Sequence, residues 1–220
     1  VEKKVLYPVL DIRLLKENKT LSFSCLAALI NYCATFAISF LISLYLQILE
    51  VDNPAQAGLV LMAQPIIMAL LSPITGMLSD KMHPQKIASV GMAVTTLGLS
   101  FFIFLSPVTS VVTVIFALLV IGLGFAFFTS PNTNAIMSSV ENRYYGTASG
   151  ILGSARTIGQ TLSMGLATSI LTAYIGAGQI KVSHSLELLS AVKLTFLIMT
   201  IVCFIGIFFS LAGYKSGQAK

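Results

Sequence analysis

The stretch TSVVTVIFALLVIGLGFAFFTSPNTNAIM, from Thr109 to Met137, carries no charged residue and is long enough to cross a bilayer as a helix. Five similar runs are Leu21–Leu49, Ala57–Ser79, Ile87–Ser106, Thr147–Ile175 and Lys193–Gly213. All are continuously apolar and do not alternate with period two, so helices are expected and a β-barrel is not. The sequence therefore predicts an all-α polytopic membrane protein with six transmembrane helices.

The composition agrees with this prediction. Of the 220 residues, 56% are hydrophobic and 10% are charged, whereas a soluble domain carries about a quarter charged residues. The connections between the runs are short, so any chemistry must lie in the helical bundle. We expect an amphipathic cytoplasmic linker over residues 1–20, a six-helix transmembrane unit over 21–213 and a cytoplasmic tail over 214–220.

The loop charges predict an orientation. Six spans put both termini on one side, and most lysines and arginines outside the spans fall on that side, among them Lys81, Lys86 and Arg143. Because cytoplasmic loops are enriched in basic residues, we expect both termini in the cytoplasm and the spans in the cell membrane. Contact with the anionic inner leaflet then accounts for the net charge of +5, and no nucleic-acid partner is expected.

Polar side chains inside the spans mark surfaces that face protein or a wet cavity, because an amide in hydrocarbon must find a partner. The predicted lining of a central cavity is Asn31, Tyr32, Gln64, Asn132, Asn134, Arg156 and Gln160. Arg156 is the one charge well inside a span. Three interpretations of it stay open: contact with a substrate or coupling group, a structural bond to carbonyls or amides, and snorkelling to an interface.

The distribution of Asn and Gln residues among the six runs also repeats along the chain. The first, second, fourth and fifth runs contain Asn or Gln, and the third and sixth contain none. This pattern indicates two three-helix units whose third members face lipid, as in the inverted repeats of a transporter half. The first and fourth helices should then line the cavity, with the second and fifth beside it. In the fifth, the small-residue pairs Gly146/Gly150 and Ala155/Gly159 predict close helix contacts.

Several stretches resemble a known family. The loop GMLSDKMHPQK, Gly76–Lys86, resembles the loop signature of the major facilitator superfamily, with His83 in place of a glycine and Gln85 in place of a basic residue. PVLDIRLLKENKTLSFSCLAAL at the start, and residues 122–160, which include GTASGILGSARTIGQ, resemble its fourteen-helix drug:proton antiporter branch. The resemblance implies the C-terminal six-helix half of such a transporter. The N-terminal half would belong to a longer chain or to a partner.

The resemblance also implies a function. It implies alternating access with proton-coupled export of amphipathic, drug-like small molecules, driven by a proton gradient and without a bound cofactor or metal. Gly76, Asp80, Lys81 and Lys86 would form a cytoplasmic gate loop. We expect Asp80 to accept hydrogen bonds from the N-terminus of the helix that begins near Gly146; the alternative is a solvated turn residue.

Two other functions stay open. An intramembrane protease needs a nucleophile and a base buried together. Ser149 lies in a span, but the only histidines are His83 and His184, which lie in loops, so no catalytic residue and no enzyme activity are expected. The stronger alternative is a non-transporting membrane module or a half-transporter that requires a partner half.

Overall fold

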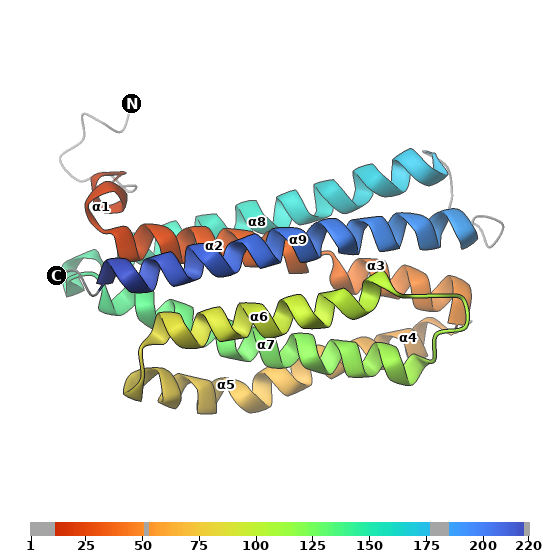
Figure 1. Cartoon of the computed structure of the whole chain (residues 1–220), viewed down its shortest axis with the longest axis horizontal. Helices are drawn as coiled ribbons and strands as arrows, with labels where there is room; N and C mark the ends of the chain where they lie inside the picture. Colours follow the sequence, from red (N-terminus) through yellow and green to blue (C-terminus); the bar gives the residue numbers. More distant parts are fainter. Residues whose placement is uncertain (1–11, 51–52, 177–184, 218–220) are drawn as a thin grey trace.

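The computed structural model describes residues 12–50, 53–176 and 185–217, and these segments are almost entirely helical (Figure 1). The helices are α1 Ile12–Glu17, α2 Lys19–Thr35, α3 Ile38–Tyr45, α4 Pro54–Leu61, α5 Ala63–Lys81, α6 Pro84–Ile103, α7 Val111–Ser138, α8 Tyr145–Ile175 and α9 Ser185–Gly217. A π-helical turn, Leu46–Glu50, follows α3, and a short 3₁₀ turn, Asn142–Tyr144, precedes α8. The predicted all-α class is confirmed.

Among the described residues, five helical segments are long and apolar enough to cross a membrane. They are Lys19–Ile48, Pro54–Lys81, Pro84–Ile103, Val111–Ser138 and Leu186–Gly213. The remaining expected span is α8, which has 31 residues but contains many Gly, Ser and Thr residues and is therefore less apolar. It lies beside α2 and α9 as a full-length member of the bundle (Figure 1).

Polar residues at the helix starts explain where several helices begin. The Asn18 side chain accepts a hydrogen bond of 3.0 Å from the Leu21 N–H at the start of α2, and Asn53 does the same for the Ala55 N–H in α4. Ser110 caps α7 in a similar way. These side chains satisfy N–H groups that have no partner within the helix.

Two of the spans are interrupted. The first breaks between α2 and α3, where the Ala37 N–H donates to Ser163 Oγ of α8 at 3.0 Å. The second breaks at Met62, between α4 and α5, because Pro65 has no N–H to continue the helical hydrogen bonds. Both breaks fall within the bundle, where interrupted helices leave backbone groups near a potential binding site.

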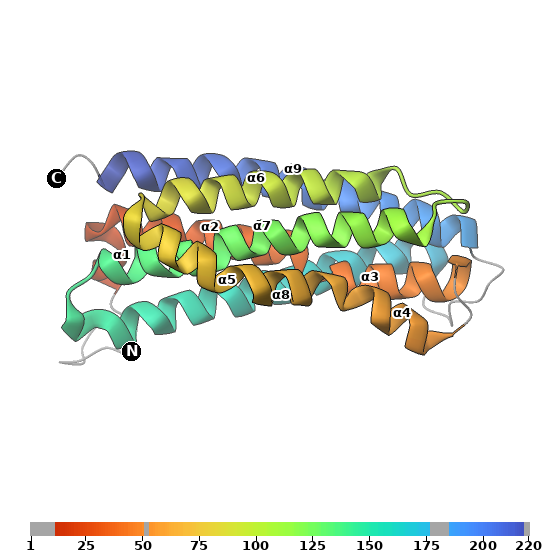
Figure 2. The same cartoon turned by 90° about the horizontal axis from the view of Figure 1, so that it is seen from below.

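The helices form three layers, which Figure 2 shows most clearly. α2 and α7 lie in the middle, and α6 and α9 pack together on one side of them, α6 against α7 and α9 against α2. On the other side, α5 packs against α7 and α8 packs against α2. Exchanging α2, α5 and α6 with α7, α8 and α9 leaves this neighbour pattern unchanged, as expected for two repeated three-helix units.

The exposed faces of the bundle differ in one respect from the prediction that the third and sixth spans, here α6 and α9, face lipid. α6 and α9 do expose apolar side chains, including Leu97, Phe101 and Phe208. The most exposed span, however, is Pro54–Lys81, of which 6% of the most apolar window is buried, compared with 50% for α6. α5 was expected to flank a cavity, but nothing in the described chain covers its outer face.

Close helix contacts depend on glycine at several positions, two of which bring α7 against α5 and α8 against α2. A Cβ atom at Gly122 of α7 would lie 2.5 Å from the Gln64 carbonyl oxygen of α5, and one at Gly159 of α8 would lie 2.5 Å from the Leu29 carbonyl oxygen of α2. The predicted Ala155/Gly159 contact is therefore present. Gly146 and Gly150, in contrast, have no neighbour within 4 Å of such an atom.

Gly159→Ala should destabilise the purified chain. The new methyl group would meet a backbone oxygen that cannot rotate away, so α8 must move off α2, at a cost of about 1–3 kcal/mol. Thermal unfolding in detergent measures the change. The matched control is Gly153→Ala, because no atom lies within 4 Å of the added methyl there. Equal melting temperatures for the two variants would contradict the packing of α8 on α2.

Candidate functional site

A hollow of about 420 Å³ lies at the break between α2 and α3, on the side of the bundle opposite α6 and α9. Its lining consists of Tyr32, Thr35, Phe36, Ser39, Phe40, Gln64, Phe125 and Met164. These residues come from α2, α3, α5, α7 and α8. Two of the predicted cavity residues, Tyr32 and Gln64, are among them.

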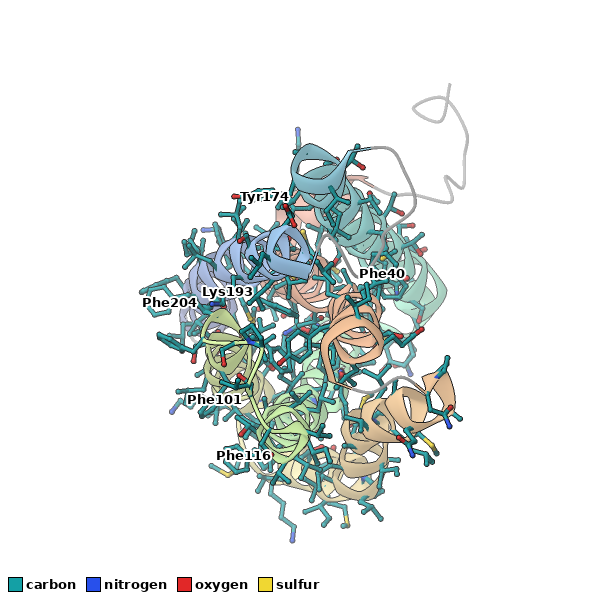
Figure 3. All side chains as sticks on the ribbon, turned by 90° about the vertical axis from the view of Figure 1, so that its right-hand side faces the viewer. Phe40, Phe101, Phe116, Tyr174, Lys193 and Phe204 are labelled. Atoms are coloured by element: carbon teal, nitrogen blue, oxygen red, sulfur yellow. The ribbon has the colours of Figure 1, made fainter. Side chains whose placement is uncertain are left out.

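One wall of the hollow is aromatic. Tyr32, Phe36 and Phe40 are spaced four residues apart and therefore lie on one face of the interrupted helix. Phe125 of α7 meets Tyr32 edge to face, with ring centroids 6.0 Å apart. Figure 3, a view along the helices, shows Phe40 on the opposite side of the molecule from the exposed Phe204.

The other lining groups are few and polar. Thr35 and Ser39 contribute hydroxyls, and Gln64 contributes an amide from α5. A largely apolar hollow with a small number of hydrogen-bonding groups is typical of sites that bind small molecules without reacting with them. Thr35 Oγ1 already donates to the Asn31 carbonyl at 2.6 Å, so Ser39 and Gln64 are the polar groups best placed to contact a ligand.

Arg156 lies next to this hollow and joins three helices. Its Nη2 donates to Thr133 Oγ1 of α7 at 2.9 Å, and its Cζ lies 5.6 Å from the centroid of the Tyr32 ring of α2. Its Nε is buried and has no hydrogen-bond partner among the described residues. Among the described residues, its partners are thus a hydroxyl and a ring, whereas the structural interpretation envisaged carbonyls or amides.

Asp80 connects the end of α5 to α7. Asn134 Nδ2 donates to Asp80 Oδ1 at 3.0 Å and to Ser79 Oγ at 2.9 Å. One turn earlier, an added Cβ at Gly76 would lie 3.2 Å from Ser130 Oγ of α7. Two residues of the predicted gate loop therefore share one cluster with Asn134, a residue predicted for the cavity.

This arrangement corrects the expected partner of Asp80. The sequence pointed to the N-terminus of α8, near Gly146. The structure gives Asp80 a side-chain partner in α7, because α5 packs against α7 while α8 packs against α2. The other two members of the predicted gate loop, Lys81 at the end of α5 and Lys86 in the first turn of α6, are exposed.

The remaining predicted cavity residues do not line the hollow. Asn31 is fully buried, and neither its Oδ1 nor its Nδ2 has a hydrogen-bond partner in the described part of the chain. It shares a face of α2 with the buried Ala27 and Ala34, which points it into the bundle. Asn132 is 3% exposed in α7, and Gln160 is half-buried in α8.

Asn134→Ala should loosen the end of α5. The variant loses the hydrogen bonds to both Asp80 and Ser79, each worth about 1 kcal/mol. We expect several-fold faster hydrogen–deuterium exchange in the last turn of α5, measured by mass spectrometry. Asn142→Ala, in the exposed turn before α8, serves as the control and should leave that exchange unchanged. Unaltered exchange in Asn134→Ala would show that the cluster does not hold α5 in place.

Comparison with known proteins gives the family. The chain matches the Major Facilitator Superfamily over residues 24–218. The riboflavin transporter RibZ of Clostridioides difficile is 28% identical over 198 residues, which are 90% of this chain and 43% of that protein. The multidrug resistance protein Stp of Mycobacterium tuberculosis is 26% identical over 178 residues, which are 80% of this chain and 33% of that protein.

A third relative, the uncharacterized transporter YebQ of Escherichia coli, is 27% identical over 167 residues, or 76% of this chain and 36% of that protein. The chain thus spans less than half the length of each of these relatives. The family match and the apolar helices together indicate a multi-pass membrane protein of a transporter family and not an enzyme. The chain belongs to the Major Facilitator Superfamily of membrane transporters.

Proposed function

We propose that this chain is the C-terminal half of a secondary transporter that exports amphipathic, drug-like molecules in exchange for protons. The observation that carries the proposal is the hollow of about 420 Å³ at the break between α2 and α3. Discontinuous helices near the middle of the membrane form the substrate sites of many transporters. Support for drug-like substrates comes from the aromatic wall and from the names of relatives such as the multidrug resistance protein Stp.

A second six-helix half would complete this site. The outer face of α4 and α5 exposes an unbroken apolar stripe: Leu59, Met62, Ile66, Leu70, Ile74 and Met77. On α8, positions Gly146, Gly150, Gly153 and Gly165 are open, with no atom within 4 Å of an added Cβ. α5 and α8 lie on the same side of the bundle as the hollow, so a partner half packed against both helices would close it.

The proton-coupling groups would belong to that other half. Apart from the first and last turns of its spans, this chain contains no Asp or Glu in its membrane helices. A proton-coupled exporter needs such groups, because an intramembrane carboxylate is the usual proton carrier. In this proposal, the present chain supplies contacts to the substrate and the gate that closes one end of the transport pathway.

The gate would lie at the end of the bundle where α5 ends and α6 begins. The Asp80–Asn134 contact ties α5 to α7 there, and Arg156–Thr133 ties α8 to α7. In this proposal Gly76, Asp80, Lys81 and Lys86 form the cytoplasmic gate loop, both ends of the chain lie in the cytoplasm, and these contacts open and close as the transporter alternates.

The test uses inside-out vesicles from membranes that contain the native protein. Acidifying the vesicle interior should drive accumulation of a fluorescent drug-like dye, and a protonophore should abolish it. Immunoblotting of the same membranes measures the mass of the native polypeptide. A native species of this chain's 23.5 kDa without any associated second half, together with absent dye flux, would favour a non-transporting membrane module.

A further inference from the structure

We infer that the site takes flat aromatic molecules that carry an anionic oxygen, and that Arg156 binds this oxygen. The inference rests on the transport function proposed above and adds the chemical class of the substrate. It combines the shape of the hollow, the environment of the Arg156 guanidinium and the placement of acidic side chains in the described residues.

The shape and lining of the hollow favour a flat ring system. Three aromatic side chains of α2 and α3 and the Phe125 ring of α7 surround a space of about 420 Å³. Aromatic rings bind other rings by offset stacking or by edge-to-face contact. The edge-to-face Tyr32–Phe125 pair shows that these walls already use the second arrangement.

The guanidinium of Arg156 has binding capacity that its protein partners do not use. Among the described residues, its five N–H groups make one hydrogen bond, to Thr133, and its Cζ lies over the Tyr32 ring. Tyr32 also lines the hollow, so the positive charge lies beside the wall against which a ligand would stack.

No described acidic side chain forms an ion pair with Arg156. Glu141 pairs with Arg143, Asp80 accepts a hydrogen bond from the neutral Asn134 amide, and Glu17 is exposed in α1. Glu187, in the first turn of α9, lies at the opposite end of the bundle from the end of α7 where Thr133 lies (Figure 1). An arginine held within an apolar bundle needs a counter-charge, carbonyl groups or water to accompany it. We assign a counter-charge to the ligand.

The same arrangement disfavours cations. A positively charged ligand in the hollow would be repelled by Arg156, because no described carboxylate forms an ion pair with its guanidinium. The amphipathic drugs accepted by this site should therefore be neutral or anionic. This distinguishes the proposed site from a cation-selective one, which would need an acidic residue in the same place.

Fluorescein and rhodamine 123 test the inference directly, because they share a flat xanthene ring but are an anion and a cation at neutral pH. Their binding to the complete native protein in detergent can be measured by fluorescence anisotropy. We expect fluorescein to bind at least tenfold more tightly than rhodamine 123. Arg156→Gln should weaken fluorescein binding at least tenfold and leave rhodamine 123 binding unchanged or stronger.

Thr133→Val provides a matched control, because it removes the Nη2 acceptor and keeps the guanidinium charge. It should weaken fluorescein binding less than Arg156→Gln does. Equal binding of the dyes, tighter binding of rhodamine 123, binding of neither dye, or unchanged fluorescein binding in Arg156→Gln would each overturn the inference. The wild-type comparison stands even if the variant fails to fold.

These results are separable from the transport proposal. Proton-driven flux in vesicles with no preference for the anionic dye would overturn the substrate class and leave transport intact. Selective fluorescein binding without any proton-driven flux would support the site and count against coupled export.

Discussion

Arg156→Ala is expected to lower the initial transport rate by about 10- to 100-fold, which corresponds to the ~1.5–3 kcal/mol of a hydrogen bond to a charged group. The truncated side chain can neither reach Thr133 nor stack on Tyr32, so contacts among α8, α7 and α2 are lost together with the charge. The measurement is proton-driven dye uptake into inside-out vesicles, normalised to the amount of transporter in the membrane.

Two controls separate charge from position. Thr133→Val keeps the guanidinium and removes one hydrogen bond, so its rate should fall only several-fold. Arg143→Ala removes an exposed arginine that pairs with Glu141 outside the spans, and surface pairs of this kind contribute little. Full flux in Arg156→Ala would show that the guanidinium has no part in the transport cycle.

Helix positions followed closely from the apolar runs, because length and hydropathy alone separate a membrane helix from a loop. The sequence placed the start of the last span at Lys193, whereas α9 begins at Ser185. Glu187 and Lys193 made this segment look like a loop. The structure buries Leu188 and Val192 in the same turns. The packing of these apolar side chains keeps the segment helical although it carries Glu187 and Lys193.

The break between α2 and α3 is a tertiary effect that the sequence alone does not reveal. No proline lies there, and the buried backbone N–H of Ala37 at the break is satisfied by Ser163, 126 residues away. The break between α4 and α5 was foreseeable from Pro65. Pro65 is a local sequence signal for the break between α4 and α5. The break between α2 and α3 depends instead on a distant partner, Ser163.

The candidate site was only partly predictable for a similar reason. Amides and arginine were the available signal, and this signal found Gln64 and Arg156 but also selected Asn31, which is buried away from the hollow. Neighbouring residues of a helix point about 100° apart, so Asn31 and Tyr32 face different surroundings. Phe36 and Phe40 were missed because an aromatic side chain in an apolar run is equally compatible with lipid and with a cavity.

The Asp80–Asn134 contact shows what a family signature contributes and where it stops. The signature drew attention to Asp80, although His83 and Gln85 depart from its pattern. It did not identify the partner, because the two residues are 54 positions apart and meet only when α5 packs on α7. A loop acid needs the packing of the helices before its role can be assigned.

Ser39→Trp should block the hollow and reduce transport on the order of tenfold or more, because an indole would occupy much of a site at the small end of ligand pockets. Ser39 lines the hollow and is exposed, so the larger side chain can extend into open space without displacing the core. The expected result is a strong loss of dye binding and flux with little change in the melting temperature.

Ile201→Trp is the matched control for this prediction. Ile201 is 51% exposed on α9, three residues before Phe204, which Figure 3 shows on the opposite side of the molecule from Phe40. A tryptophan there should face lipid and leave flux unchanged. If Ser39→Trp kept wild-type flux, the substrate could not pass through the space beside α3. The substrate site would then have to lie elsewhere in the transporter, away from the aromatic wall. Loss of flux in Ser39→Trp alone would instead tie the substrate route to the break between α2 and α3.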